Sequence, residues 1–161
     1  MGGDIHIKIS NVLTMNIKIR PLNIELDIEA IKKLSIQLGY PNQENLSNRL
    51  AMIQKDENYI SLVVEYENQI IAYTGFIRFR SWELDGEFIR IQTFVVDENH
   101  RGQGIGKLLL NAIENFAKEH QISRVLLNSA NHEGRTIAHQ FYKNQGYDAK
   151  STGFNKWINL D

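Results

Sequence analysis

The chain has 161 residues, a length typical of a single domain. Eighteen Lys and Arg residues against nineteen Asp and Glu residues give a net charge of −1, which excludes the strongly basic surface needed to bind nucleic acid or an anionic membrane. The sequence contains no cysteine, which excludes disulfides, thiolate nucleophiles and Cys-ligated zinc and fits a reducing compartment.

The first residues, MGGDIHIKIS, are interrupted by Asp4, His6 and Lys8 and therefore lack the apolar core of a secretory signal. No stretch of the sequence approaches the roughly 20 apolar residues of a membrane span. We expect residues 1–15 to be an N-terminal extension, either an expression remnant or the product of an upstream start. Residues 16–161 are expected to form one domain located in the cytoplasm.

The first predicted elements are a strand and two helices. Apolar residues alternate with polar ones over 17–22, which predicts a strand. Asp27 is a candidate N-cap for a helix over 28–38, and Gly39 ends that helix. Apolar residues at spacings of four and three predict a second helix over 46–53.

The period then changes to that of strands. Residues 59–66 and 70–79 are rich in β-branched and aromatic side chains, and the polar segment 67–69 between them predicts a hairpin turn. A polar loop over 80–86 leads to a third long strand over 88–96.

The last part of the chain alternates helices and strands. A helix that ends near His120 precedes a short buried strand over 125–127, and a helix over 136–144 is closed by Gly146. Phe154, Trp157 and Ile158 suggest a terminal strand after Gly153. The order β-α-α-β-β-β-α-β-α-β-β predicts an α/β (mixed α+β) fold, with a central twisted mixed sheet of about seven strands and helices on both faces.

A glycine-rich loop joins the third long strand to the following helix. Gly102, Gly104 and Gly106 allow backbone N–H groups to turn toward one point and allow a ligand to approach closely. Together with the positive end of the helix dipole, these groups form an anion site suited to a pyrophosphate. Arg101 and Lys107 add two cationic side chains.

Three ligand-binding patterns compete for this loop. Both the P-loop and the dinucleotide-binding fingerprint require a glycine five residues after Gly102, where the chain has Lys107, so both fail. The acyl-CoA pattern Arg/Gln-x-x-Gly-x-Gly/Ala is met by Arg101, Gly104 and Gly106. A tight turn without a ligand is the remaining alternative, although it would need fewer glycines and no flanking cations.

A second motif lies on the helix over 136–144, where Ala138, Tyr142, Gly146 and Tyr147 match the pattern Ala-x-x-x-Tyr-x-x-x-Gly-Phe/Tyr. From roughly Ile17 to Trp157, the chain resembles the GNAT superfamily of acyl-CoA-dependent N-acetyltransferases. The segments VVDENHRGQGIGKLLL and AHQFYKNQGY carry most of the resemblance, and the second is typical of an Arg-x-x-Ala-His-x-Phe-Tyr branch. The resemblance implies the GNAT fold and a transferase that uses acetyl-CoA, with no metal.

The resemblance also implies which residues hold acetyl-CoA. The strand before the loop would offer backbone groups to the pantetheine arm, and the loop would cradle the diphosphate. Arg135 stands where many relatives have Asn. A cation at a helix N-terminus is unfavourable without an anion, so the position of Arg135 favours binding of a cofactor phosphate. A solvated surface position is the alternative. The implied binding residues are Phe94, Val95, Val96, Arg101, Gly102, Gln103, Gly104, Ile105, Gly106, Lys107, Asn131 and Arg135.

Aminolysis of a thioester needs a neutral amine, a polarised carbonyl and a proton or hydrogen bond for the departing thiolate. By the resemblance, Tyr142 is the general acid, and packing in the core is its alternative role. Gln92 occupies the strand position at which many relatives have Glu, and an amide cannot take a proton. Deprotonation would therefore use a water held by Gln92, or the carboxylate of Glu87 or Glu83.

The expected reaction moves an acetyl group to a primary amine of a small molecule by direct attack in a ternary complex. The acceptor is expected in a cleft between the first two helices and the loop over 80–87. Glu83, Asp85 and Glu87 would favour a cationic acceptor, such as an aminoglycoside or polyamine. A non-catalytic acyl-CoA-binding regulatory module, a nucleotide-phosphate binder, acetylation of a protein amine and a homodimer all stay open.

Overall fold

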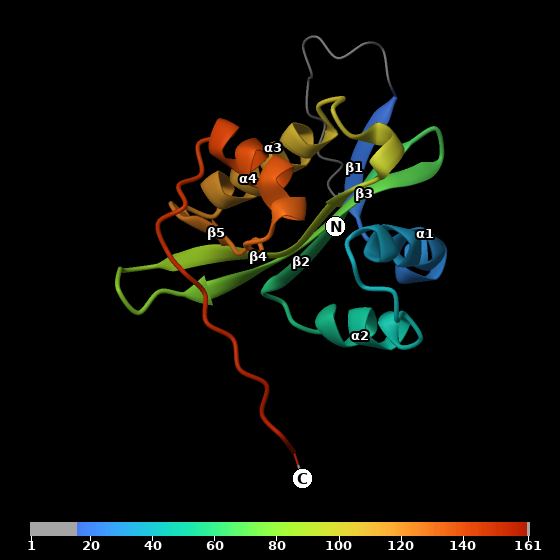
Figure 1. The fold of residues 1–161 in the computed structure, drawn as a ribbon. Helices are drawn as coiled ribbons and strands as arrows, with labels where there is room; N and C mark the ends of the chain where they lie inside the picture. Colours follow the sequence, from blue (N-terminus) through green and yellow to red (C-terminus); the bar gives the residue numbers. More distant parts are fainter. Residues whose placement is uncertain (1–15, 161) are drawn as a thin grey trace. The chain divides into compact units, whose positions relative to one another are not determined.

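The computed structural model describes residues 16–160, so the expected N-terminal extension lies outside the described residues (Figure 1). Residues up to Leu126 form one compact unit and those from Leu127 form a second, and each unit is described by itself. In chain order the elements, with η for a short 3-10 helix, are β1 (Ile17–Pro21), α1 (Ile24–Gln37), α2 (Leu46–Ile53), β2 (Tyr59–Tyr66), β3 (Gln69–Arg80), β4 (Glu87–Val96), η1 (Glu98–His100), α3 (Ile105–Glu119), β5 (Val125–Leu127), η2 (Glu133–Arg135) and α4 (Thr136–Asn144).

The strands form one sheet in the order β1-β2-β3-β4-β5, and the first four are joined by antiparallel ladders. The predicted order of elements is confirmed from β1 to α4. The prediction of about seven strands is wrong: residues 148–160 contain no strand, so the described chain has five. The apolar residues Phe154, Trp157 and Ile158 lack the period-two alternation of a strand and are exposed.

Helices cover both faces of the sheet within the first unit (Figure 1). On one face, α1 and α2 bury a cluster against the sheet, formed by Leu22, Ile31, Leu34, Leu46, Leu50, Val63, Tyr73 and Val95. On the other face lies α3, whose Phe116 ring meets the Phe76 ring edge-on with centroids 5.3 Å apart. The fully buried Phe76, Ile89 and Leu109 belong to this second layer.

The first helix begins earlier than the sequence predicts. Its N-cap is Asn23, whose side chain accepts from the Leu26 N–H, and its first residue is Ile24, so the prediction of Asp27 as the cap is wrong. Asp27 lies in the first turn, where its carboxylate accepts from the Asn23 N–H at 2.9 Å. Both are cap-forming residue types, and the sequence alone does not distinguish them.

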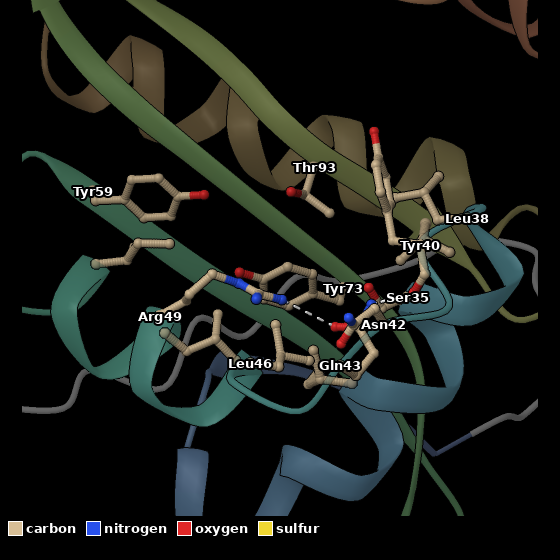
Figure 2. A pocket seen from close by; sticks show the side chains of 14 residues that line it. Ser35, Leu38, Tyr40, Asn42, Gln43, Leu46, Arg49, Tyr59, Tyr73 and Thr93 are labelled. Atoms are coloured by element: carbon tan, nitrogen blue, oxygen red, sulfur yellow. Dashed lines mark hydrogen bonds between the residues drawn. The ribbon is translucent and has the colours of Figure 1, made fainter. Parts of the chain in front are cut away.

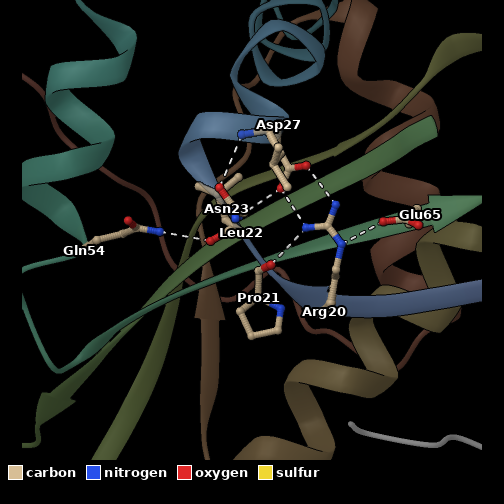
Figure 3. Close-up of polar contacts among 8 residues, drawn as sticks. Arg20, Pro21, Leu22, Asn23, Asp27, Gln54 and Glu65 are labelled. Carbon is tan, nitrogen blue, oxygen red and sulfur yellow. Dashed lines mark hydrogen bonds and ion pairs between the residues drawn. The ribbon is translucent and has the colours of Figure 1, made fainter. Parts of the chain in front are cut away.

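Asp27 also anchors an ion-pair network that joins β1, α1 and β2 (Figure 3). The Arg20 guanidinium donates to both Asp27 carboxylate oxygens, at 2.7 and 2.8 Å, and its Nε donates to Glu65 at 2.7 Å. Burial opposes the charged form of Asp27, but the hydrogen bonds from Arg20 and Asn23 outweigh it and lower the pKa of the carboxyl. Gln54, just after α2, donates to the Leu22 carbonyl at 3.2 Å and ties the second helix to the same corner.

The second unit holds η2, α4 and the irregular C-terminal segment. The predicted helix over 136–144 is confirmed, and Gly146, with φ of 88°, reverses the chain directly after it. In neither unit does the described chain include a helix with the length and apolar character that crossing a membrane requires.

Candidate active site

Strand β4 carries a bulge next to the centre of the sheet. In the ladder with β3, Thr93 faces Gly75 and Ile91 faces Phe76, so Gln92 is the extra residue. The bulge turns Thr93 and Val95 toward the α1 and α2 side of the sheet, where both line a pocket. The side chain of Gln92 is exposed and does not line that pocket.

The pocket lies between α1, α2 and strands β2 to β4, with a volume of about 450 Å³ (Figure 2). This is within the size range of small-molecule sites. Its lining consists of Ile31, Ser35, Leu38, Tyr40, Asn42, Gln43, Leu46, Arg49, Leu50, Ile53, Tyr59, Tyr73, Thr93 and Val95. The predicted cleft beside the first two helices is therefore present, but strands rather than the loop over 80–87 form its other wall.

Hydroxyl groups form a connected row on the sheet side of the pocket. The Tyr73 hydroxyl oxygen lies 3.3 Å from Ser61 Oγ. The Tyr59 hydroxyl is hydrogen-bonded to the side chains of both Tyr73 and Thr93. Burial is the main cause that raises the pKa of Tyr59 and of Tyr73 above the ordinary value. Both phenols therefore stay protonated near neutral pH, where they act as hydrogen-bond donors rather than as bases.

Gly75 makes this arrangement of hydroxyls possible. A Cβ at this position would lie 3.0 Å from the Tyr73 hydroxyl and would overlap the Tyr59 hydroxyl. A glycine inside a strand commonly marks such a close approach. The packing of the two phenols against the bare backbone of β3 thus explains an otherwise unfavourable strand residue.

The predicted anion-binding loop directly follows β4. Gly102 and Gly104 have φ of 73° and 84°, and Gly104 is the N-cap of the fifteen-residue α3. The first intrahelical hydrogen bond runs from the Leu108 N–H to the Gly104 carbonyl at 3.0 Å, so the N–H groups before it have no carbonyl partner within the helix. A Cβ on either glycine would meet nothing within 4 Å, which leaves open space beside these donors.

The loop is fastened to α1 through Asp97. Gln37 donates to the Asp97 carboxylate at 2.9 Å and accepts from the Glu98 N–H at 2.9 Å. His100 Nδ1 lies 2.9 Å from the same carboxylate. Burial of Asp97 favours its neutral form, but the hydrogen bonds from Gln37 and His100 prevail and lower its pKa. These contacts hold the entrance of the loop in place before any ligand binds.

The cationic side chains of the loop are at its surface. Arg101 and Lys107 are exposed, and Arg101 Nε donates to the Val96 carbonyl at 3.0 Å. Gln103 donates to the Asn99 carbonyl at 3.1 Å. Within the described residues, no group of three His, Asp or Glu side chains could hold a metal ion.

In the second unit, Tyr142 lies on α4, and Arg135, the last residue of η2 and the N-cap residue of α4, interacts with it electrostatically. Burial raises the pKa of the Tyr142 hydroxyl to about 12, and the charge of Arg135 acts in the opposite direction. The Tyr142 ring packs between the rings of Phe141 and Tyr147, with centroids 5.3 and 5.9 Å away. Asn131, the weaker predicted cofactor residue, is exposed just before η2.

The acidic residues of the hairpin between β3 and β4 are engaged elsewhere. The Glu87 carboxylate accepts two hydrogen bonds from Arg78, at 2.6 and 3.0 Å. Glu83 accepts from Arg124 at 3.0 Å. Neither these two carboxylates nor Asp85 lines the pocket.

Sequence reasoning missed most of the pocket. Tyr59 and Tyr73 fit a strand pattern, Thr93 has no special signal, and Arg49 has the spacing of a solvated helix face. The one available hint was Gly75, since a glycine within an apolar strand indicates a bulge or a close approach.

The combination of a bulged central strand, a pocket beside it and a glycine loop at the start of the next helix defines the class of protein. The model of the Acetyltransferase (GNAT) family matches residues 28–147, and the chain belongs to that family.

Two similar proteins make the relationship concrete. A GNAT family acetyltransferase from Staphylococcus aureus is 33% identical, with a TM-score of 0.74, and the match covers 88% of this chain and 98% of that one. Human N-acetyltransferase 8B is 30% identical over 101 residues, which are 61% of this chain and 43% of that protein. This chain therefore matches less than half the length of that curated relative.

Other solved structures share the fold at lower identity. Glucosamine-6-phosphate N-acetyltransferase from Arabidopsis thaliana is 23% identical, with a TM-score of 0.72 and coverage of 89% of this chain and 99% of that one. At this identity the likeness shows the fold alone.

Proposed function

We propose that the protein transfers an acetyl group from acetyl-CoA to a primary amine of a small molecule, by direct attack within a ternary complex. The observation that carries the proposal is that one strand, β4, runs from the pocket to the glycine loop. Thr93 and Val95 line the pocket, and Val96 leads into the glycine loop. At about 3.3 Å per strand residue, the pocket and the start of the loop are roughly 10 Å apart along one strand.

The residues of the loop fit acetyl-CoA. The open N–H groups at the start of α3, the two glycines with positive φ and the cations of Arg101 and Lys107 would hold the diphosphate. The backbone of Phe94, Val95 and Val96 would accompany the pantetheine arm, with Gln103, Ile105 and Gly106 completing the loop and Asn131 and Arg135 as further contacts. When bound, acetyl-CoA supplies the thioester carbonyl that the amine attacks.

The protein has to leave the amine neutral and to stabilise the departing thiolate. An alkyl amine has a pKa of about 10.4, so its neutral fraction grows steadily from pH 7 upward. Glu87 is occupied by Arg78 and lies outside the pocket, so we propose that a water, rather than a dedicated carboxylate, receives the proton. Because the Gln92 side chain does not line the pocket either, backbone carbonyls of β4 at the bulge around Gln92 would hold this water. Tyr142, protonated at these pH values, would donate a hydrogen bond to the thiolate.

The acceptor belongs in the pocket between α1, α2 and the sheet. The hydroxyl row of Tyr59, Tyr73 and Thr93 offers hydrogen bonds next to the bulge. The acidic hairpin between β3 and β4 would favour a cationic acceptor, but its carboxylates Glu87 and Glu83 are paired with arginines and do not line this pocket. We place the reaction in the cytoplasm, in accord with a sequence that has no cysteine.

Two measurements test the proposal. In a thermal-shift titration, acetyl-CoA should raise the Tm while ATP at the same concentration should not, because ligand binding to the folded state stabilises it. In a panel of primary amines, release of free CoA should exceed spontaneous hydrolysis for at least one acceptor. Stabilisation without turnover of any amine would indicate a regulatory acyl-CoA-binding module, and equal stabilisation by ATP would indicate a nucleotide-phosphate binder.

A further inference from the structure

The lining of the pocket carries a single formal charge, which is positive. Among the residues that line it, Arg49 carries the only formal charge at neutral pH, and the polar remainder consists of hydroxyl and amide groups. An acceptor with a second positive charge would therefore meet a guanidinium and no carboxylate. An acceptor with a negative group would instead find a partner in the guanidinium of Arg49.

Arg49 differs from three other arginines of the same unit. Arg20, Arg78 and Arg124 each pair with a carboxylate. Arg49 has no carboxylate partner within residues 16–160, and its Nη2 donates instead to the neutral Gln43 Oε1 at 3.3 Å. Its positive charge is thus available to a guest in the pocket.

The orientation of this guanidinium is set by a buried side chain. Gln43 is only 8% exposed, and its Nε2 donates to the Tyr40 carbonyl, so its Oε1 has to face the other way, toward Arg49. Figure 2 shows Arg49 extending from α2 across the pocket toward Gln43, while Thr93 comes from the strand. A guanidinium held in this way presents parallel donors to a carboxylate or phosphate.

We infer that the acceptor is a small molecule that carries both a primary amine and an oxyanion, either carboxylate or phosphate, and that Arg49 binds the oxyanion. The amine of such a molecule would lie beside the hydroxyl row at β4. The inference rests on the proposed function, because it takes the pocket as the acceptor site.

A matched series of acceptors tests the inference. 5-Aminopentanoate, 5-aminopentanamide, pentylamine and 1,5-diaminopentane share a carbon chain and have similar amine pKa values, and 4-aminobutyl phosphate supplies the phosphate arm. The wild-type protein should have a kcat/KM for the carboxylate or the phosphate at least about tenfold above that for the diamine. The relative values for the two anions distinguish the two oxyanions.

Variants of Arg49 test the role of its charge. Arg49→Gln should lower kcat/KM for the preferred anionic acceptor by about 10- to 100-fold, mainly through KM, as expected for the loss of a charge-assisted hydrogen bond. Pentylamine should change by less than about twofold, and Arg49→Lys should restore part of the loss. The control is Lys55→Gln, which removes an exposed positive charge just after α2 that does not line the pocket and should change neither acceptor.

The outcomes distinguish a wrong acceptor class from a wrong proposed function. Turnover that favours the diamine, or an Arg49→Gln effect of equal size on every acceptor, would overturn the inference and leave the acetyltransferase proposal intact. Absence of CoA release with both anionic acceptors, while another primary amine of the panel is acetylated, would likewise overturn only the inference. Absence of CoA release with every amine of the panel would overturn the proposed function and this inference with it.

Discussion

The hydroxyl of Tyr142 provides the first prediction at the scale of single residues. Tyr142→Phe should lower kcat by about 10²–10⁴-fold and should change the KM for acetyl-CoA much less, because the hydroxyl is needed mainly when the sulfur leaves. Steady-state kinetics with one good amine is the measurement. Tyr147→Phe, which removes a hydroxyl from the neighbouring ring, is the control and should keep kcat within a few-fold of wild type.

The raised pKa of Tyr142 adds a pH dependence to this prediction. A phenol with a pKa of about 12 stays protonated between pH 7 and 10. The wild-type kcat/KM should therefore rise through this range as the amine becomes neutral, with no fall caused by Tyr142. A decline that begins below pH 10 and disappears in Tyr142→Phe would show that the phenol ionises in that range, contrary to this account.

Asp27 is a buried carboxylate whose charge contributes to stability. It is 3% exposed and receives two hydrogen bonds from Arg20, so Asp27→Asn should lower the free energy of unfolding by about 2–4 kcal/mol at pH 7. Urea denaturation measures this loss. Glu29→Gln, which breaks the exposed pair with Lys32, is the control and should remain close to wild type.

The sign of the pH dependence follows from the lowered pKa of Asp27. A carboxyl with a lowered pKa in the folded state contributes stability above its unfolded pKa of about 3.9 and loses that contribution as the pH falls through the folded value. The difference between wild type and Asp27→Asn should thus shrink below about pH 4. A difference that stays constant from pH 7 to pH 3 would mean that the charge contributes nothing.

At the scale of elements, the packing of β3 against two phenols can be tested with a double-mutant cycle. Gly75→Ala should destabilise the protein by about 1–3 kcal/mol, because the new Cβ overlaps the Tyr59 hydroxyl. Tyr59→Phe in the same chain should recover part of that loss by removing the overlapping atom. Additive effects of the two substitutions in urea denaturation would contradict this contact.

The start of α3 gives the second prediction at this scale. Gly104→Asp places a negative side chain beside the helix N–H groups and should abolish the rise in Tm caused by acetyl-CoA. Gly86→Asp is a matched control, since Gly86 also has a positive φ, of 98°, and open space around its Cβ, but lies in the hairpin between β3 and β4. If both variants responded fully to acetyl-CoA, the loop would not be its binding site.

Local patterns allowed most of these elements to be predicted from the sequence. Alternating apolar residues predicted β1, and β-branched and aromatic residues predicted β2 and β3. Helical spacing predicted α2 and α3, and the three glycines predicted the anion-binding loop. Each of these signals lies within about fifteen neighbouring residues. The start of α1 was missed because Asn23 and Asp27 are both cap-forming residue types, and the hydrogen bonds that engage the Asp27 carboxylate with Arg20 of β1 form only in the folded chain.

The pocket could not be predicted because its residues come together only through tertiary structure. The register of β2, β3 and β4 brings Tyr59, Tyr73 and Thr93 side by side. The bulge at Gln92 turns Thr93 to the pocket side, and β4 itself contains no glycine or proline that would indicate it. The availability of Arg49 depends on which carboxylates lie near it in space, and spacing along a helix does not reveal this.

At the scale of the whole molecule, the glycine loop and the pocket are proposed to serve a single reaction. If the amine attacks acetyl-CoA directly, each molecule of free CoA should appear together with one molecule of acetylated amine. A module that only binds acyl-CoA would be stabilised by it but would form no product.

The measurement that tests this claim most directly follows free thiol and acetylated amine in the same reaction, by thiol titration and mass spectrometry. The account predicts equal amounts of the two products, a rate at least about 100-fold lower in Gly104→Asp, and an almost unchanged rate in Gly86→Asp. Saturating acetyl-CoA binding with no acetylated amine above the protein-free reaction, across the whole acceptor panel, would contradict it.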